Sequence, residues 1–461
     1  MTERGPRTRS TQDLLSASDS IRWPPLPRRG MSRVLALLRY FDQTQWWVPE
    51  RIEEAQFRQL RRLLRHAAGV PFYARRFEAA GIDPAALDPE SWRRIPPLTR
   101  RDIQQEKLLS RQCPKEHGRI YFQQSSGSTG EPVRIGSTDV TMLFWSAFTV
   151  RNHEWHRHDC GGRLASIRAP TEAKEPRLQD SWGSPLSNLY RTGPGGTLSL
   201  NVDVSKQARW LAEFDPDYLL TYPSNLRAII EYCREHGLRL KSLRAVQTIS
   251  ETVGDDLRAL CREVWDVPLV DTYSSQEVGY MAMQCPDRAE PVYHVQAEGV
   301  YLEIVDDDGR PCRPGEVGRV IVTSLHNFAT PLVRYEVGDR AEAGGEPCAC
   351  GRGLVTLHRV LGRERNMLTM PDGEKRWPLT GYRQYGEVAP EVRQFQFIQR
   401  SREKVEVRLV VSQPMTPAHE AGLRALILSM LGHPFELVFT VMDAIPKSPR
   451  GKFEEFISEV A

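Results

Sequence analysis

The chain has 461 residues, with 62 lysines and arginines against 59 aspartates and glutamates, so its formal net charge is +3. This length predicts two or three domains with buried cores. The near balance of charge excludes a protein that binds nucleic acids through its overall charge. No apolar run reaches the roughly 18–20 residues that cross a bilayer, so we expect no membrane span. Most of the eight cysteines are scattered singly, which is typical of reduced thiols in a cytoplasmic protein.

The first elements are an arm and a helix. Residues 1–30 are rich in Arg, Ser and Pro and have no apolar periodicity, which predicts a disordered or extended arm. Apolar residues then recur at helical spacing between residues 52 and 68. The Val70-Pro71 pair ends that helix, because a residue before proline avoids the helical backbone region.

The middle of the chain alternates short apolar runs with amphipathic stretches. We expect strands at 218–221, 245–249 and 269–273, and helices at 224–236 and 255–264. This alternation predicts parallel βαβ units. Strands expected at 301–305 and 319–323, on either side of an acidic turn at 306–309, predict an antiparallel meander or barrel.

The last hundred residues predict a small α+β unit. We expect strands at 394–398, 405–411 and 437–441 and a helix at 417–431. Together these elements predict an α/β fold with a large multi-layer N-terminal domain, which contains parallel βαβ units and a smaller β-meander, and a small α+β C-terminal cap.

A loop rich in glycine and hydroxyl residues follows the strand-like residues 120–122. Its glycines allow left-handed backbone geometry, so successive N–H groups can point inward and bind an anion, and its hydroxyls add donors. The alternative is a flexible polar linker. The candidate nucleotide-binding residues of the loop are Ser125, Ser126, Gly127, Ser128, Thr129 and Gly130.

This loop resembles the phosphate-binding signature of the adenylate-forming superfamily, which contains acyl-CoA synthetases, luciferases and the adenylation domains of peptide synthetases. Its form, SSGSTGEP, resembles the phenylacetate–coenzyme A ligase branch with its capsular-biosynthesis relatives. The segments 70–73 and 95–100 resemble the same branch. The resemblance covers most of residues 50–452, and the later motifs follow in the family's order.

The segment DTYSSQE, residues 271–277, resembles the family motif that ends in a glutamate. A tyrosine can stack on adenine, and a carboxylate can hold Mg²⁺ against the triphosphate. The resemblance implies a catalytic, Mg²⁺-binding role for Glu277, for which a solvated carboxylate is the alternative. It also implies nucleotide contacts; the candidates are Asp271, Tyr273, Ser274 and Gln276. Ser274 replaces the usual glycine and Gln276 the usual hydroxyl residue, which leaves the α-phosphate contact open.

Two further segments resemble nucleotide contacts of the family. Ser250, Glu251 and Thr252 follow a predicted strand and resemble the stretch that lines the adenine pocket, which agrees with ligand binding at the carboxyl ends of parallel strands. Asp339, in the motif RYEVGD, is implied to accept hydrogen bonds from both ribose hydroxyls. The alternative for Asp339 is a turn residue that caps the next segment.

The end of the chain resembles the family's hinge and mobile domain. The segment 362–366 resembles the hinge, and Arg363 is implied to reach the nucleotide, although Arg365 replaces a common aspartate. The loop at 370–375 is closer to the capsular-biosynthesis subgroup. Lys452, in IPKSPRGK, is implied to bridge the attacking carboxylate and the α-phosphate. We therefore expect a large domain at 31–361 and a small mobile domain at 362–461.

Three cysteines and one histidine form a candidate metal site. Cys348 and Cys350 are separated by one residue, and Cys285 precedes His294 by nine positions. Three thiolates and an imidazole are a frequent zinc set, and a site closed by four protein ligands is structural. The alternative is a group of unpaired thiols.

The resemblance implies ATP-dependent activation of a carboxylic acid, with aromatic acids expected, and transfer of the acyl group to coenzyme A. An amine or a carrier-protein thiol is the alternative acceptor, and a silent nucleotide-binding homologue is a third reading. Candidate walls of the acid pocket are Phe144, Trp145 and Tyr222, which could equally be core residues. ATP, Mg²⁺ and structural Zn²⁺ are the expected cofactors, and a homodimer is compatible with the resemblance.

Overall fold

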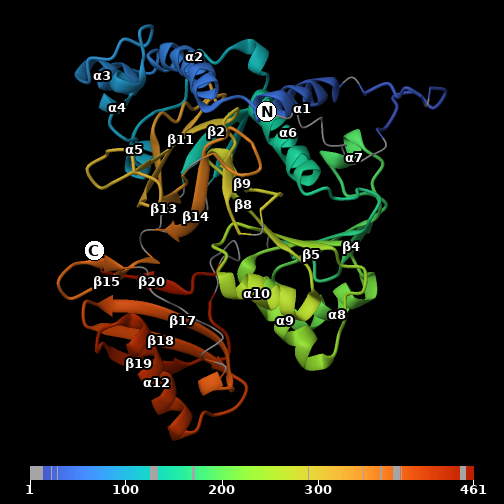
Figure 1. Cartoon of the computed structure of the whole chain (residues 1–461), viewed down its shortest axis with the longest axis vertical. Helices are drawn as coiled ribbons and strands as arrows, with labels where there is room; N and C mark the ends of the chain where they lie inside the picture. Colours follow the sequence, from blue (N-terminus) through green and yellow to red (C-terminus); the bar gives the residue numbers. More distant parts are fainter. Residues whose placement is uncertain are drawn as a thin grey trace.

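The computed structural model contains a large body and a smaller C-terminal unit, which lies below the body in Figure 1. It describes residues 14–21, 23–28, 30–124, 133–168, 172–288, 290–345, 347–363, 366–376, 385, 387–446 and 453–460. Within these ranges no helix is long and apolar enough to cross a membrane.

The N-terminal part is helical. Its helices are α1 (Ser32–Thr44), α2 (Pro49–Ala67), α3 (Pro71–Ala79), α4 (Pro89–Arg94) and α5 (Arg100–Gln105). The predicted helix at 52–68 is confirmed as α2. Pro71 also starts a new helix, because proline's fixed φ and missing N–H suit the first helical turn. Before α1, the described part of the predicted arm runs along α7 (Leu186–Leu189), where the Leu15 amide donates to the Leu189 carbonyl at 2.8 Å.

Five parallel strands form one half of a twelve-stranded sheet. They are β3 (Leu164–Arg168), β5 (Gly195–Ser199), β6 (Tyr218–Thr221), β7 (Ala245–Ile249) and β8 (Leu269–Ser275). The crossover helices are α8 (Val204–Phe214), α9 (Pro223–His236) and α10 (Asp255–Trp265), which pack on one side of these strands and share a core with them (Figure 1). The βαβ prediction is confirmed.

The other half of the sheet is antiparallel and continues from β8 through β9. Its strands are β9 (Gly279–Gln284), β10 (Tyr293–Val295), β11 (Val300–Val305), β12 (Val317–Ser324), β13 (Tyr335–Ala343) and β14 (Thr356–Arg363); β4 (Arg177–Gln179) is antiparallel at the opposite edge. The predicted antiparallel pair is confirmed, with Tyr301 opposite Thr323. The helix α6 (Asp139–Trp155) packs against α1 and β9.

A separate hairpin, β1 (Ile120–Gln124) and β2 (Arg134–Thr138), flanks the predicted phosphate loop. A 3-10 turn at Lys115–His117 precedes it.

The C-terminal unit has a four-stranded sheet in the order β19-β18-β17-β20 and one long helix. Its elements are β17 (Val392–Ser401), β18 (Lys404–Val411), α12 (Pro417–Leu431), β19 (Glu436–Val441) and β20 (Phe456–Ser458), preceded by a short hairpin of β15 (Leu368–Thr369) and β16 (Lys375–Arg376). Apolar residues from the sheet and α12 form its own core. The predicted α+β unit is therefore confirmed.

Candidate functional site

Three predicted nucleotide contacts from distant parts of the sequence lie together. The Tyr273 hydroxyl at the end of β8 donates to Asp339 Oδ2 at 2.8 Å. Arg363 Nε lies 3.7 Å from Asp339 Oδ1, because β13 and β14 pair these two residues in register. A phenol, a carboxylate and a guanidinium thus face one another where these strands meet.

Burial and neighbouring carboxylates together set the charge of this group. Desolvation, followed by the neighbouring Asp339 carboxylate, raises the pKa of Tyr273, so the phenol stays a neutral donor. Burial alone would lower the pKa of Arg363, but the carboxylates of Asp339, Glu277 and Glu454 outweigh it and raise that pKa. The guanidinium is therefore a fixed cation.

Glu277 lies in the turn after β8 and faces a cation. Its Oε1 is 3.8 Å from Arg100 Nη1, and both side chains are largely buried. Arg100 is the first residue of α5, where Thr99 and Asp102 form a capping box that fixes the start of the helix. Its carboxylate already faces one cation, so Glu277 fits a site for a positive ligand.

Arg100 is a site residue that the sequence reasoning missed. The signal was present, because the segment 95–100 was one of those that resembled the family. Glu277 is far from Arg100 in the sequence, so only the fold reveals their ion pair.

The segment Ser250–Thr252 follows β7 and turns sharply, since Ser250 has a φ of +73°. Glu251 accepts hydrogen bonds from the Ser224 amide at 2.9 Å and the Phe453 amide at 2.8 Å. A Cβ at Gly362 would lie 2.6 Å from Thr252 Oγ1, so the predicted hinge packs tightly against this turn.

The remaining residues of the DTYSSQE segment lie at different depths. Asp271 is buried, and its carboxylate accepts from the Tyr293 hydroxyl at 2.9 Å and the Thr248 hydroxyl at 3.2 Å. Burial raises the pKa of Asp271. These contacts hold Asp271 within the sheet, whereas Ser274 is half-buried and Gln276 is exposed at the surface of the turn.

Two of the predicted aromatic pocket residues are neighbours on α6. The Phe144 ring stacks on His326 with centroids 3.8 Å apart, and Trp145 packs on Tyr280 at 4.6 Å. Tyr222 precedes α9 and belongs to the core of the parallel half of the sheet.

Several predicted residues lie outside the described part of the chain. They are the phosphate-loop residues Ser125–Gly130, the hinge residue Arg365 and the terminal Lys452. Their roles stay predictions.

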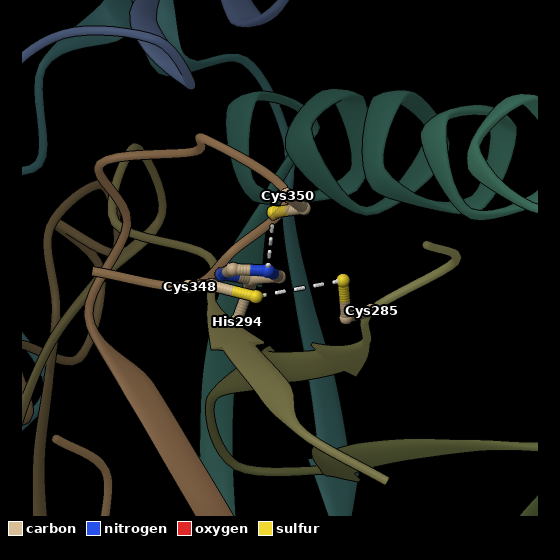
Figure 2. A group of neighbouring side chains, drawn as sticks. All are labelled: Cys285, His294, Cys348 and Cys350. Atoms are coloured by element: carbon tan, nitrogen blue, oxygen red, sulfur yellow. Dashed lines mark hydrogen bonds between the residues drawn. The ribbon is translucent and has the colours of Figure 1, made fainter. Parts of the chain in front are cut away.

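The four predicted metal ligands converge on one point (Figure 2). Cys285 follows β9, His294 lies in β10, and Cys348 and Cys350 lie in the connection from β13 to β14. Their ligand atoms all lie within 4.8 Å of one another. Cys285 Sγ is 3.9 Å from Cys348 Sγ, and Cys350 Sγ is 3.4 Å from His294 Nε2.

These distances fit a tetrahedral ion. With zinc–sulfur bonds near 2.3 Å, two thiolates of a tetrahedral site lie about 3.8 Å apart, and a thiolate and an imidazole nitrogen about 3.5 Å apart. Hydrogen bonding from Cys285, reinforced by His294, lowers the pKa of the Cys350 thiol although burial opposes this. The cluster thus supplies the ligand types and spacing that zinc requires.

The chain was compared with known families and structures. The family model described as the CapK C-terminal domain matches residues 382–459. A phenylacetate-coenzyme A ligase of Thermus thermophilus is 26% identical over 336 residues, which cover 69% of this chain and 72% of the relative. The Escherichia coli phenylacetate-coenzyme A ligase is 27% identical over 69% of this chain and 73% of its own length. Protein CapK of Staphylococcus aureus is 22% identical, with 78% of each chain covered.

A crystal structure of 2-hydroxyisobutyryl-CoA ligase, in the postadenylation state, superposes with a TM-score of 0.69, covering 90% of this chain and 91% of that one at 16% identity. This likeness confirms the fold. Three findings point to the same branch of proteins. The relatives include phenylacetate-coenzyme A ligases and CapK, the C-terminal residues match the CapK C-terminal domain, and the fold is that of an acyl-CoA ligase. The chain is thus similar in sequence to phenylacetate–coenzyme A ligases and to CapK, and these similarities support a place in that branch of the adenylate-forming superfamily.

Proposed function

We propose that this chain uses ATP to convert a carboxylic acid to an acyl-adenylate, with release of pyrophosphate, and then transfers the acyl group to coenzyme A. The observation that carries the proposal is the group of Tyr273, Asp339 and Arg363, whose side chains contact one another. It offers a ring, a carboxylate for two ribose hydroxyls and a fixed cation, next to Glu277.

The proposed reaction has two steps, and each residue of the site has a role in them. A carboxylate oxygen of the acid attacks the α-phosphorus of ATP, and the bond to the pyrophosphate oxygen breaks. Asp339 and Arg363 orient the nucleotide, and Lys452 offsets the repulsion between the two anions as they approach. Glu277 would hold Mg²⁺, which would supply charge neutralisation for the phosphates. The thiol sulfur of coenzyme A then attacks the acyl carbon, AMP departs, and the thiol proton is lost to solvent.

The proposed domain boundary lies at Gly362, between a body of residues 31–361 and a mobile unit of residues 362–461. The φ of Gly362 is +95°, a conformation that glycine adopts without strain, which suits a hinge. A hinged unit can present Lys452 for the first step and withdraw it for the second.

An aromatic acid is the proposed substrate. Support comes from α6, which carries Phe144, stacked on His326, and Trp145, which packs on Tyr280 and is partly exposed. Flat apolar walls of this kind suit a planar ring. Tyr222, which lies in another core, is a weaker candidate for the same pocket.

An amine or a carrier-protein thiol is the second candidate acceptor. The observation that favours it is the connection after the hinge, which closes as a tight hairpin between Leu368 and Arg376 with Gly373 at a φ of +94°. It contains the segment that differs from the usual coenzyme A ligase loop.

Release of AMP distinguishes the acceptors. The protein is incubated with ATP and an acid that it activates, and then with coenzyme A or with a panel of amines. We expect coenzyme A to accelerate AMP release by at least about tenfold, since transfer follows from binding a thiol beside the adenylate. Acceleration by an amine alone would reject coenzyme A as the acceptor.

The Cys/His cluster is proposed to hold a structural zinc ion. It joins β9, β10 and the connection before β14, and the neighbouring Arg352 donates to Gln45 at 2.9 Å and to Asp287 at 3.0 Å. An ion there would fasten the sheet to the segment between α1 and α2.

A further inference from the structure

The turn after β7 contacts both ends of the C-terminal unit. Thr252 packs against Gly362, where this unit begins, and Glu251 accepts a hydrogen bond from Phe453, near its end. One short turn of the large body therefore contacts the hinge and the terminal segment at once.

The segment that begins at Phe453 is hydrogen-bonded to both the large body and the C-terminal unit. Phe453 is buried, and its N–H donates to Glu251 Oε1 at 2.8 Å. The next residues are fixed to the C-terminal unit, since the Glu454 carbonyl accepts from Gln396 and the Glu455 carbonyl from Phe397. The carboxylate of Glu251 thus holds a segment that is otherwise part of the C-terminal sheet.

Glu251 itself is rigidly placed. Its other oxygen, Oε2, accepts from the Ser224 amide at 2.9 Å, in the first turn of α9. The N-cap residue of α9, Tyr222, makes no side-chain cap, so the Glu251 carboxylate takes this role at a helix end that favours negative charge. The positive φ of Ser250 directs the chain so that Glu251 reaches both amides.

We propose that Glu251 is a positioning residue that latches the C-terminal unit in the orientation for adenylate formation. Its carboxylate holds the amide that follows Lys452 directly in the chain, so it sets where the lysine can act without touching the substrate. This inference rests on the proposed function, because it assigns Lys452 to the first step. Release of the latch would free the unit for the second step.

The latch is tested with Glu251→Gln, which keeps the side-chain size but presents an NH₂ group to one of the two amides. We expect acyl-adenylate formation to slow by about tenfold, the loss of one charge-assisted hydrogen bond. Both carboxylate oxygens of Glu251 accept from backbone amides, so the latch assigns the predicted adenine contact of this stretch to its other residues. The KM for ATP and the transfer of a pre-formed acyl-adenylate to coenzyme A are therefore expected to change by less than about twofold.

Two controls separate the latch from general damage. Glu235→Gln removes the exposed ion pair of Glu235 with Arg393, another contact between the two units, and is expected to leave the rate unchanged because such pairs contribute little. Glu251→Asp, which keeps the charge but shortens the reach, should give an intermediate loss. In a Lys452→Ala background, Glu251→Gln should have no further effect, since both act through the same lysine.

Three results would overturn the latch. Glu251→Gln could slow acyl-adenylate formation as much in the Lys452→Ala background as in the wild type, it could change the KM for ATP alone, or it could form the acyl-adenylate at the wild-type rate. Hydrogen exchange gives a readout that needs no activity: Glu251→Gln, but not Glu235→Gln, should speed exchange in residues 453–458. If the wild-type protein activates no acid, the proposed function fails, and unchanged exchange would then reject the latch separately.

Discussion

Replacing Lys452 with alanine is expected to slow acyl-adenylate formation by about 100- to 1000-fold, the usual effect of removing a group that stabilises charge in the transition state. The attacking carboxylate and the α-phosphate are both anions, so an ammonium between them lowers the barrier. Single-turnover release of pyrophosphate measures this step. Transfer of a pre-formed acyl-adenylate to coenzyme A should change little, because that step no longer joins two anions.

The matched control is Lys404→Ala, in the same C-terminal unit. Lys404 forms a surface ion pair with Glu436 at 2.7 Å, and its loss should alter the rate by less than about twofold. Equal slowing of both half-reactions by Lys452→Ala would contradict the assigned role, since it would indicate a general loss of structure.

Replacing Cys348 with serine is expected to abolish zinc binding and to destabilise the large body. The ion would join three segments, and structural zinc contributes its binding free energy to folding. We expect the apparent melting temperature to fall by about 5–10 °C, which corresponds to a few kcal/mol for a body of this size. Metal analysis of protein purified without a chelator, followed by thermal unfolding, measures both effects.

Cys113→Ser is the control, because Cys113 is a half-buried thiol outside the cluster. It should retain about one zinc ion per chain and melt near the wild-type temperature. Wild-type protein that carries almost no metal under reducing conditions, and melts at the same temperature as Cys348→Ser, would show that the four residues hold no ion.

The parallel half of the sheet was predictable from local pattern. The strands at 218–221 and 245–249 match β6 and β7 residue for residue, since buried parallel strands are short apolar runs between amphipathic helices. The helix at 417–431 was equally clear, with Thr416 as its cap and Gly432 ending it in the left-handed conformation.

The contacts of the site were less predictable, because they depend on register and on pairing between distant segments. Asp339 faces Arg363 only because of how β13 pairs with β14, and a shift of one residue would turn either side chain to the other face. Asp271 shares its motif with Tyr273, yet its carboxylate is bound inside the sheet. The metal ligands could be predicted from their residue types. The Glu251–Phe453 contact could not, because its residues are 202 positions apart and no motif links them.

Exchange of labelled pyrophosphate into ATP, measured with a panel of carboxylic acids, tests the central claim most directly. It reports formation of the acyl-adenylate whatever the acceptor is. We expect exchange that depends on the added acid and is strongest with aromatic acids. No exchange with any acid, in protein that measurably binds ATP, would contradict the account and identify a catalytically silent nucleotide-binding homologue.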